Sequence, residues 1–203
     1  MSEMSLEHSA SHAEHPKYPS AQTISNSKLA MWLYLASEVV IFATLIAVYL
    51  IFRSHNADAV HEVHRELGLG LVSLNTFLLL TSSWAMVMGL REAQKNNSTG
   101  LVRWLGLTAL LGTAFVCLQG VEYTELGHAG ISLATEFGMR FYAPTAFHGA
   151  HVIVGVLWAL RVINRGRKGY YNSQNYLGIE IFGLYWHFVD VVWLFLFTIF
   201  YLI

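Results

Sequence analysis

Long apolar runs separated by short polar segments make up most of the chain. A helix needs about 20 mostly apolar residues to cross a bilayer. Five segments are long enough, at about 28–52, 68–90, 101–123, 141–163 and 177–203. The strands of a membrane β-barrel would instead alternate apolar and polar residues over about ten positions. Because helices satisfy their own backbone hydrogen bonds in lipid, the pattern predicts an all-α membrane protein, a bundle of five transmembrane helices.

The composition supports a membrane location and excludes several other classes of protein. Hydrophobic residues make up 55% of the 203 residues and charged residues only 12%, whereas a soluble domain has about 25% charged residues. A net charge of -1 gives no basic surface for nucleic acid. The single cysteine, Cys117, excludes a disulfide framework and any metal site with several cysteines.

The first 27 residues are polar and differ from the rest of the chain. They lack the apolar stretch of a secretory signal peptide, and we expect a flexible cytoplasmic tail followed by one membrane domain at 28–203. His8, His12 and His15 lie in this tail. The alternative is a histidine tail that binds a metal, although no other residue there defines a ligand geometry.

Lysine and arginine are unevenly distributed between the two sides of the predicted bundle. Nine lie in the N-terminal segment and in the loops after the second and fourth spans, against three in the other two loops. The positive-inside rule therefore predicts a cytoplasmic N-terminus and a periplasmic C-terminus. Tyr201, close to the end of the last span, is typical of an aromatic anchor at the membrane interface.

Glu38 lies near the middle of the first span. An ionisable group at this depth is costly and suggests a functional role. Its carboxyl group must be protonated, paired or hydrogen-bonded, and must face other helices. Two interpretations remain open, a hydrogen bond between helices and a role in proton handling.

Gln119, Glu122 and Tyr123 lie towards the outer end of the third span. Glu122 follows Gln119 by one helical turn, so the two side chains share a face of the helix. The group is interpreted either as a structural hydrogen-bond cluster or as a contact with a lipid headgroup or an ion.

His148 and His151 share a face of the fourth span, three residues apart. Gly149 and Gly155 are expected to permit close approach of a neighbouring helix. Structural hydrogen bonding, contact with a lipid phosphate, and metal or haem ligation are the alternatives. The last needs more ligands than these two, because protein metal sites normally have three or four.

His187 and Asp190 are three residues apart in the last span. Their spacing allows the imidazole and the carboxyl group to hydrogen-bond each other within the bilayer. A structural pair and a proton relay are the two interpretations of this motif.

Five segments, in order along the chain, resemble subunit III of the haem-copper terminal oxidases. They are WLYLASE (Trp32 to Glu38), LLLTSS (Leu78 to Ser83), the Gln-x-x-Glu-Tyr element (Gln119 to Tyr123), FHGAHVIVG (Phe147 to Gly155) and YWHFVDVVWLFLF (Tyr185 to Phe197). The resemblance extends from about residue 28 to the C-terminus and covers all five predicted helices. Longer members of the family have seven helices. This chain resembles the short five-helix bacterial form, which implies a location in the bacterial plasma membrane.

The resemblance implies a non-catalytic subunit of a proton-pumping oxidase that reduces oxygen to water in aerobic respiration. Subunit III carries no haem or copper, because those centres belong to subunits I and II. It packs against subunit I, holds phospholipids in a cleft and sustains proton uptake. Subunit II and a small subunit IV are further expected neighbours. The last-helix motif favours cytochrome c as the electron donor over quinol.

The resemblance also assigns roles to single residues. Glu38 matches the family's carbodiimide-reactive glutamate. The other matching polar positions are associated with lipid contact or helix packing, and they are Gln119, Glu122, Tyr123, His148, His151, His187 and Asp190. No catalytic, cofactor-binding or metal-binding residue is expected in this chain.

Two other functions remain as alternatives. The first is the related five-helix accessory subunit found with nitric oxide reductases. The second is a transporter that acts alone, which would need a continuous polar stripe where the sequence has only isolated clusters.

Overall fold

The computed structural model describes residues 20–56 and 68–203, and this part of the chain is helical throughout apart from its short connections. The elements are α1 (Ala21–His55), α3 (Leu69–Gln94), α4 (Ser98–His128), α5 (Glu136–Arg167), α6 (Leu177–Phe197) and the π-helical turn η1 (Thr198–Leu202). The described residues contain five helices long and apolar enough to cross a membrane, which confirms the predicted architecture. His8, His12 and His15 lie outside the described residues.

The helices extend beyond the apolar segments from which they were predicted. Residues 21–27, assigned to a flexible tail, form the first two turns of α1, so that boundary was wrong. Ser20 caps this helix by accepting a hydrogen bond from the Thr23 backbone N–H, and Asn97 and Thr135 cap α4 and α5 in the same way. A polar cap stabilises the first turn in or out of lipid, so hydropathy alone underestimates helix length.

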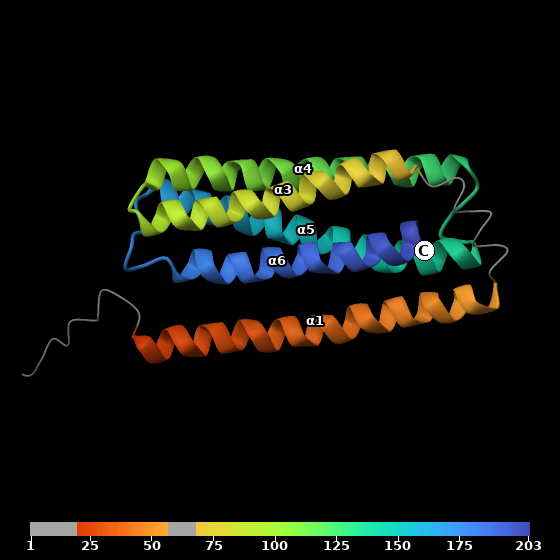
Figure 1. Cartoon of the computed structure of the whole chain (residues 1–203), viewed down its shortest axis with the longest axis horizontal. Coiled ribbons are helices and arrows are strands. Elements are labelled where there is room, and N and C mark those ends of the chain that lie inside the picture. The colour runs from red at the N-terminus through yellow and green to blue at the C-terminus, as the bar shows by residue number, and fades with distance from the viewer. Residues whose placement is uncertain (1–19, 57–67) are drawn as a thin grey trace, which may run out of the picture.

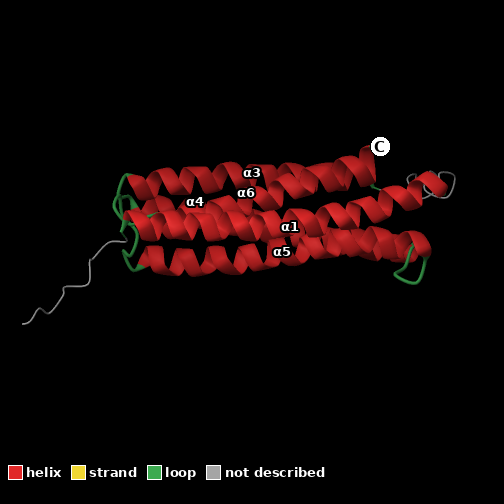
Figure 2. Cartoon of the chain, turned by 90° about the horizontal axis from the view of Figure 1, so that it is seen from below, coloured by secondary structure: helices red, strands yellow, loops and turns green. Residues whose placement is uncertain are grey.

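Four helices, α3 to α6, form a compact group, and α1 lies along one flank of that group (Figures 1 and 2). α1 packs against α5 and α6. It runs parallel to α6, because Lys28 Nζ lies 2.7 Å from Glu180 Oε1 near one end and Arg53 donates to the Ile199 carbonyl oxygen near the other. The first and last helices therefore cross the bundle in the same direction.

The connections at the end of the bundle where α4 and α6 begin are tied together by polar contacts. Asn96, which has a φ of 61°, accepts a hydrogen bond from the Ser173 backbone N–H through its side chain. The Arg165 guanidinium lies over the ring of Tyr170, 5.3 Å from its centroid. Burial raises the pKa of the neighbouring Tyr171 phenol, so this group stays neutral at physiological pH. This is the end that the charge distribution assigns to the cytoplasm.

Trp186 of α6 occupies the centre of the four-helix group. Its ring fits against two glycines, Gly112 of α4 and Gly155 of α5, where an added Cβ would lie 2.7 and 2.5 Å from ring atoms. Gly155 therefore permits the close helix approach expected of it. The same expectation for Gly149 was wrong, because an added Cβ there would meet no atom within 4 Å.

Candidate functional site

Glu38 of α1 and His151 of α5 form a pair between the two helices. Glu38 Oε2 lies 3.3 Å from His151 Nε2, and only 8% of Glu38 is exposed. The rings of Phe42 and Phe147 contact the imidazole with centroid separations of 5.4 and 4.7 Å. The structure thus brings together two residues that the sequence had singled out separately, and it surrounds them with apolar groups.

The hydrogen bonds of His151 determine what this pair can do. Its Nδ1 lies 2.8 Å from the Phe147 carbonyl oxygen. A carbonyl oxygen only accepts, so Nδ1 carries a hydrogen. Nε2 is then the nitrogen that faces Glu38 Oε2, and this oxygen has no hydrogen-bond partner among the described residues. A carboxylic acid at Glu38 can donate its O–H to this nitrogen if the carboxyl group rotates, so the arrangement can hold one transferable proton.

His148 lies on α5 one turn before His151 but makes a different contact. It is fully buried, and its Nε2 donates to the Val189 carbonyl oxygen of α6 at 3.1 Å. Phe115 and Trp193 pack on its ring, with centroids at 5.6 and 5.0 Å. In residues 20–56 and 68–203 no three His, Cys, Asp or Glu side chains are grouped so that they could hold a metal ion.

Glu122 lies at the centre of a second buried polar cluster. Its two carboxyl oxygens accept hydrogen bonds from Gln119 Nε2 at 2.8 Å and from the Tyr201 hydroxyl at 2.6 Å. Tyr201 is only 2% exposed, so its prediction as an interface anchor was wrong. Tyr123 belongs to a neighbouring contact, in which its hydroxyl donates to Thr145 Oγ1 of α5 at 2.9 Å. The cluster joins α4 to the end of the last helix.

His187 and Asp190 do not hydrogen-bond each other as the sequence suggested. His187 Nδ1 instead lies 2.5 Å from Ser83 Oγ of α3. Neither carboxyl oxygen of Asp190 has a hydrogen-bond partner among the described residues, although only 4% of the residue is exposed. His187 and Asp190 do lie one turn apart on α6, but the imidazole contacts the Ser83 hydroxyl of α3 in place of the Asp190 carboxyl group.

Hydroxyl groups of α3 bind the tryptophans of α6, a set of contacts that the sequence analysis missed. Thr76 Oγ1 accepts from Trp193 Nε1 at 2.9 Å, and Ser82 Oγ accepts from Trp186 Nε1 at 3.0 Å. The signal was present, since Thr76 and Ser82 are polar positions on an apolar helix, but the sequence does not show which helix they face. These bonds fix the register of α6 against α3.

Thr76→Val is expected to lower the free energy of unfolding by about 1–3 kcal/mol, because it leaves the buried Trp193 N–H without an acceptor. Thr81→Val is the matched control, since the Thr81 hydroxyl bonds only to the Phe77 carbonyl of its own helix. The measurement is the denaturant concentration at which each purified variant loses its helical signal. Equal midpoints for the two variants would show that the α3–α6 bond contributes nothing.

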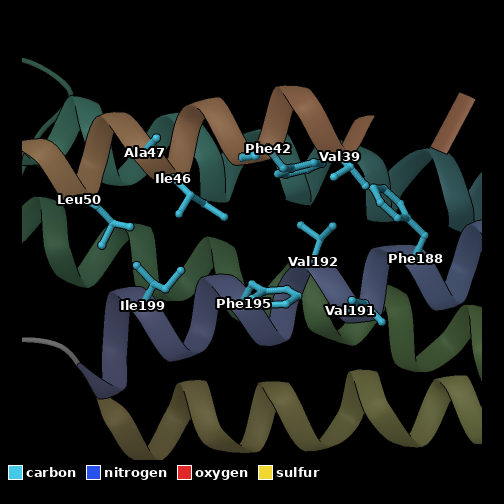
Figure 3. Close-up of a pocket in the computed structure, with 11 residues that line it drawn as sticks. Val39, Phe42, Ile46, Ala47, Leu50, Phe188, Val191, Val192, Phe195 and Ile199 are labelled. Carbon is cyan, nitrogen blue, oxygen red and sulfur yellow. The ribbon is translucent and has the colours of Figure 1, made fainter. Parts of the chain in front are cut away.

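An apolar groove runs between α1 and α6 (Figure 3). Two adjoining cavities of about 400 and 470 Å³ share Val39, Phe188 and Val191 in their walls, so they form one continuous groove. Its remaining lining residues are Trp32, Leu35, Ala36, Phe42, Ala43, Ile46, Ala47, Leu50, Leu184, His187, Val192, Phe195 and Ile199. Within this lining His187 is the only ionisable side chain, and it lies at the wall nearest α3.

The family model for cytochrome c oxidase subunit III matches residues 11–203. The chain belongs to this family. The match confirms the resemblance that the five motifs indicated.

Curated relatives match most of the chain. A cytochrome c oxidase subunit 3 of Synechocystis sp. is 40% identical over 173 residues, covering 84% of this chain and 73% of the relative. That of Thermostichus vulcanus is 37% identical and covers 86% of each chain. A quinol oxidase subunit 3 of Bacillus subtilis is 35% identical and covers 92% of this chain and 94% of its own. The protein is therefore a subunit III of a haem-copper oxidase, a multi-pass protein of the bacterial plasma membrane.

Proposed function

We propose that this subunit III is non-catalytic and serves its oxidase in two ways, by holding phospholipid at its surface and by sustaining proton uptake. The continuous groove between α1 and α6 supports the first role, and the Glu38–His151 pair supports the second. In this proposal the haems and copper belong to the partner subunits. The chain packs against subunit I, with subunit II and a small subunit IV as further neighbours.

The dimensions of the groove suit the hydrocarbon chains of a phospholipid. Its walls extend from Trp32 to Leu50 along α1, which is about 27 Å at 1.5 Å per residue. The hydrocarbon core of a bilayer is about 30 Å thick. Arg53 lies just beyond Leu50 and is the cation nearest in sequence to that end, where its guanidinium donates to the Ile199 carbonyl oxygen.

Filling the groove is expected to expel lipid. Ala43→Trp places an indole in the space lined by Phe42 and Ile46, so the purified complex should retain fewer phospholipids. Native mass spectrometry of the detergent-solubilised complex counts the bound lipids. Val40→Trp is the control, because Val40 is 65% exposed and does not line the groove. The same lipid count for wild type and Ala43→Trp would contradict lipid binding in this groove.

The electron donor and the orientation are also proposed. Cytochrome c is the proposed donor, with quinol as the alternative. The distribution of lysine and arginine supports a cytoplasmic N-terminus and a periplasmic C-terminus, and the parallel course of α1 and α6 agrees with termini on opposite sides. A cysteine placed at Asn96 should then react with a membrane-impermeant thiol reagent in inverted vesicles and not in intact cells.

A further inference from the structure

Ser83 of α3 lies opposite two ionisable residues of α6. Its hydroxyl oxygen is 2.5 Å from His187 Nδ1. Asp190 follows His187 by one turn and therefore lies on the same side of α6. Asp190 is among the buried residues of this helix, whereas His187 is partly exposed and lines the α1–α6 groove. The three side chains thus lead from the groove into the bundle.

Within residues 20–56 and 68–203, Asp190 has no positively charged partner to balance a carboxylate. The α3 face that packs against this part of α6 presents the hydroxyls of Thr76 and Ser82, and each of these already accepts from a tryptophan. His148 of α5 reaches this part of α6, and its Nε2 is engaged with the Val189 carbonyl oxygen. No salt bridge to Asp190 occurs among the described residues. An unpaired charge buried in this way is costly, so the neutral acid is the stable form.

A neutral carboxylic acid still needs an acceptor for its O–H. Ser83 Oγ can accept one hydrogen bond while it donates another. Since a serine hydroxyl has a single hydrogen, donation to His187 Nδ1 leaves its lone pairs free for the Asp190 O–H. His187 then carries its own hydrogen on Nε2.

We propose that Asp190, Ser83 and His187 form a proton-binding site. Both carboxyl oxygens of Asp190 are unpartnered in the structure, and a protonated Asp190 that turns its O–H toward Ser83 Oγ completes a hydrogen-bonded chain in which Ser83 donates to His187 Nδ1. The site opens on the groove through His187 Nε2–H. It is separate from the Glu38–His151 pair, which joins α1 to α5. It does not depend on whether lipid occupies the groove.

The hydrogen-bonded chain of Asp190, Ser83 and His187 can exchange one proton with a water molecule in the groove. In the outward direction, Nε2 loses its proton to a water molecule, Nδ1 takes the Ser83 proton, and Ser83 Oγ takes the Asp190 proton. Asp190 is then a carboxylate that accepts from Ser83, and Nδ1–H donates to Ser83 Oγ. One proton has left the site and no covalent bond between heavy atoms has changed. The return of a proton to Nε2 reverses each step.

Infrared spectroscopy of the purified complex tests the site without relying on activity. The wild-type spectrum should contain the C=O stretch of a neutral carboxylic acid that is lost in Asp190→Asn. Ser83→Ala should shift this band to higher frequency, because the acid loses its acceptor, whereas Ser83→Thr should leave it in place. Thr81→Val is the control and should not shift the acid band, because Thr81 lies on the same helix as Ser83 but takes no part in the proposed hydrogen bonds.

Deuterium exchange tests the connection to the groove. In deuterated buffer the Asp190 band should shift more slowly in His187→Phe than in wild type, because the path through the imidazole is removed. Loss of a carboxylate band rather than an acid band in Asp190→Asn would overturn the proposal, as would an unshifted acid band in Ser83→Ala. The comparison of wild type with Asp190→Asn needs no substitution at Ser83, so it remains decisive if Ser83→Ala does not assemble.

Discussion

Gly155→Ala is expected to destabilise the subunit by about 1–3 kcal/mol, the usual cost of overpacking a well-filled core. The added methyl carbon would lie 2.5 Å from Trp186 Cζ3 and 2.8 Å from Trp186 Cε3. The indole cannot easily move away, because its other edge packs directly against the backbone of α4 at Gly112. Its Nε1 also donates a hydrogen bond to Ser82 Oγ. Relief therefore requires α5 and α6 to separate. The measurement is the temperature at which the purified complex loses this subunit.

Gly149→Ala is the matched control for Gly155→Ala. It lies on the same helix, six residues away, and its added methyl group meets nothing within 4 Å. Alanine is a better helix former than glycine by about 1 kcal/mol, so this variant should be as stable as wild type or more stable. If Gly155→Ala dissociates at the same temperature as Gly149→Ala, the account of Trp186 packing is contradicted.

Glu38→Gln is expected to leave the initial rate of oxygen consumption nearly unchanged and to shorten the working life of the oxidase several-fold during turnover. Glutamine keeps the shape of the side chain and can donate its amide N–H to His151 Nε2, so α1 should remain in place. It has no carboxyl proton to exchange, which is the property that the proposed role in proton uptake requires of the Glu38–His151 pair. If that proton supports uptake, the defect should accumulate with turnover rather than with time at rest.

The experiment follows oxygen consumption until it stops, in parallel with samples incubated without donor. Glu125→Gln removes an acidic side chain of α4 that is exposed, and it is the control for loss of charge alone. Equal numbers of turnovers before inactivation in Glu38→Gln and wild type would leave packing between α1 and α5 as the whole role of the pair.

The spans could be predicted from the sequence because each is longer than the bilayer core and continuously apolar. The ends could not be predicted in the same way. Ser20, Asn97 and Thr135 extend the helices through side-chain caps, and hydropathy does not record such contacts. Hydropathy therefore locates membrane segments, while local hydrogen bonding decides where the helices begin.

The polar positions could be identified from the sequence, but their partners could not. Gln119 and Glu122 are three residues apart on one helix, and their predicted contact is present. Glu38 and His151 come from helices distant in the chain, and only the packing of α1 on α5 brings them together. Asp190 shows the limit of local spacing, since Ser83 of another helix lies closer to His187.

The central claim is that this chain works as a subunit III within a haem-containing oxidase. The most direct test is to isolate the chain with an affinity tag from gently solubilised native membranes and record the optical spectrum and oxygen consumption of what is bound to it. We expect a reduced haem a- or o-type spectrum, together with oxygen consumption supported by cytochrome c. Haem b and c bands with consumption of nitric oxide would contradict it in favour of a reductase, and a stable chain free of haem would contradict it altogether.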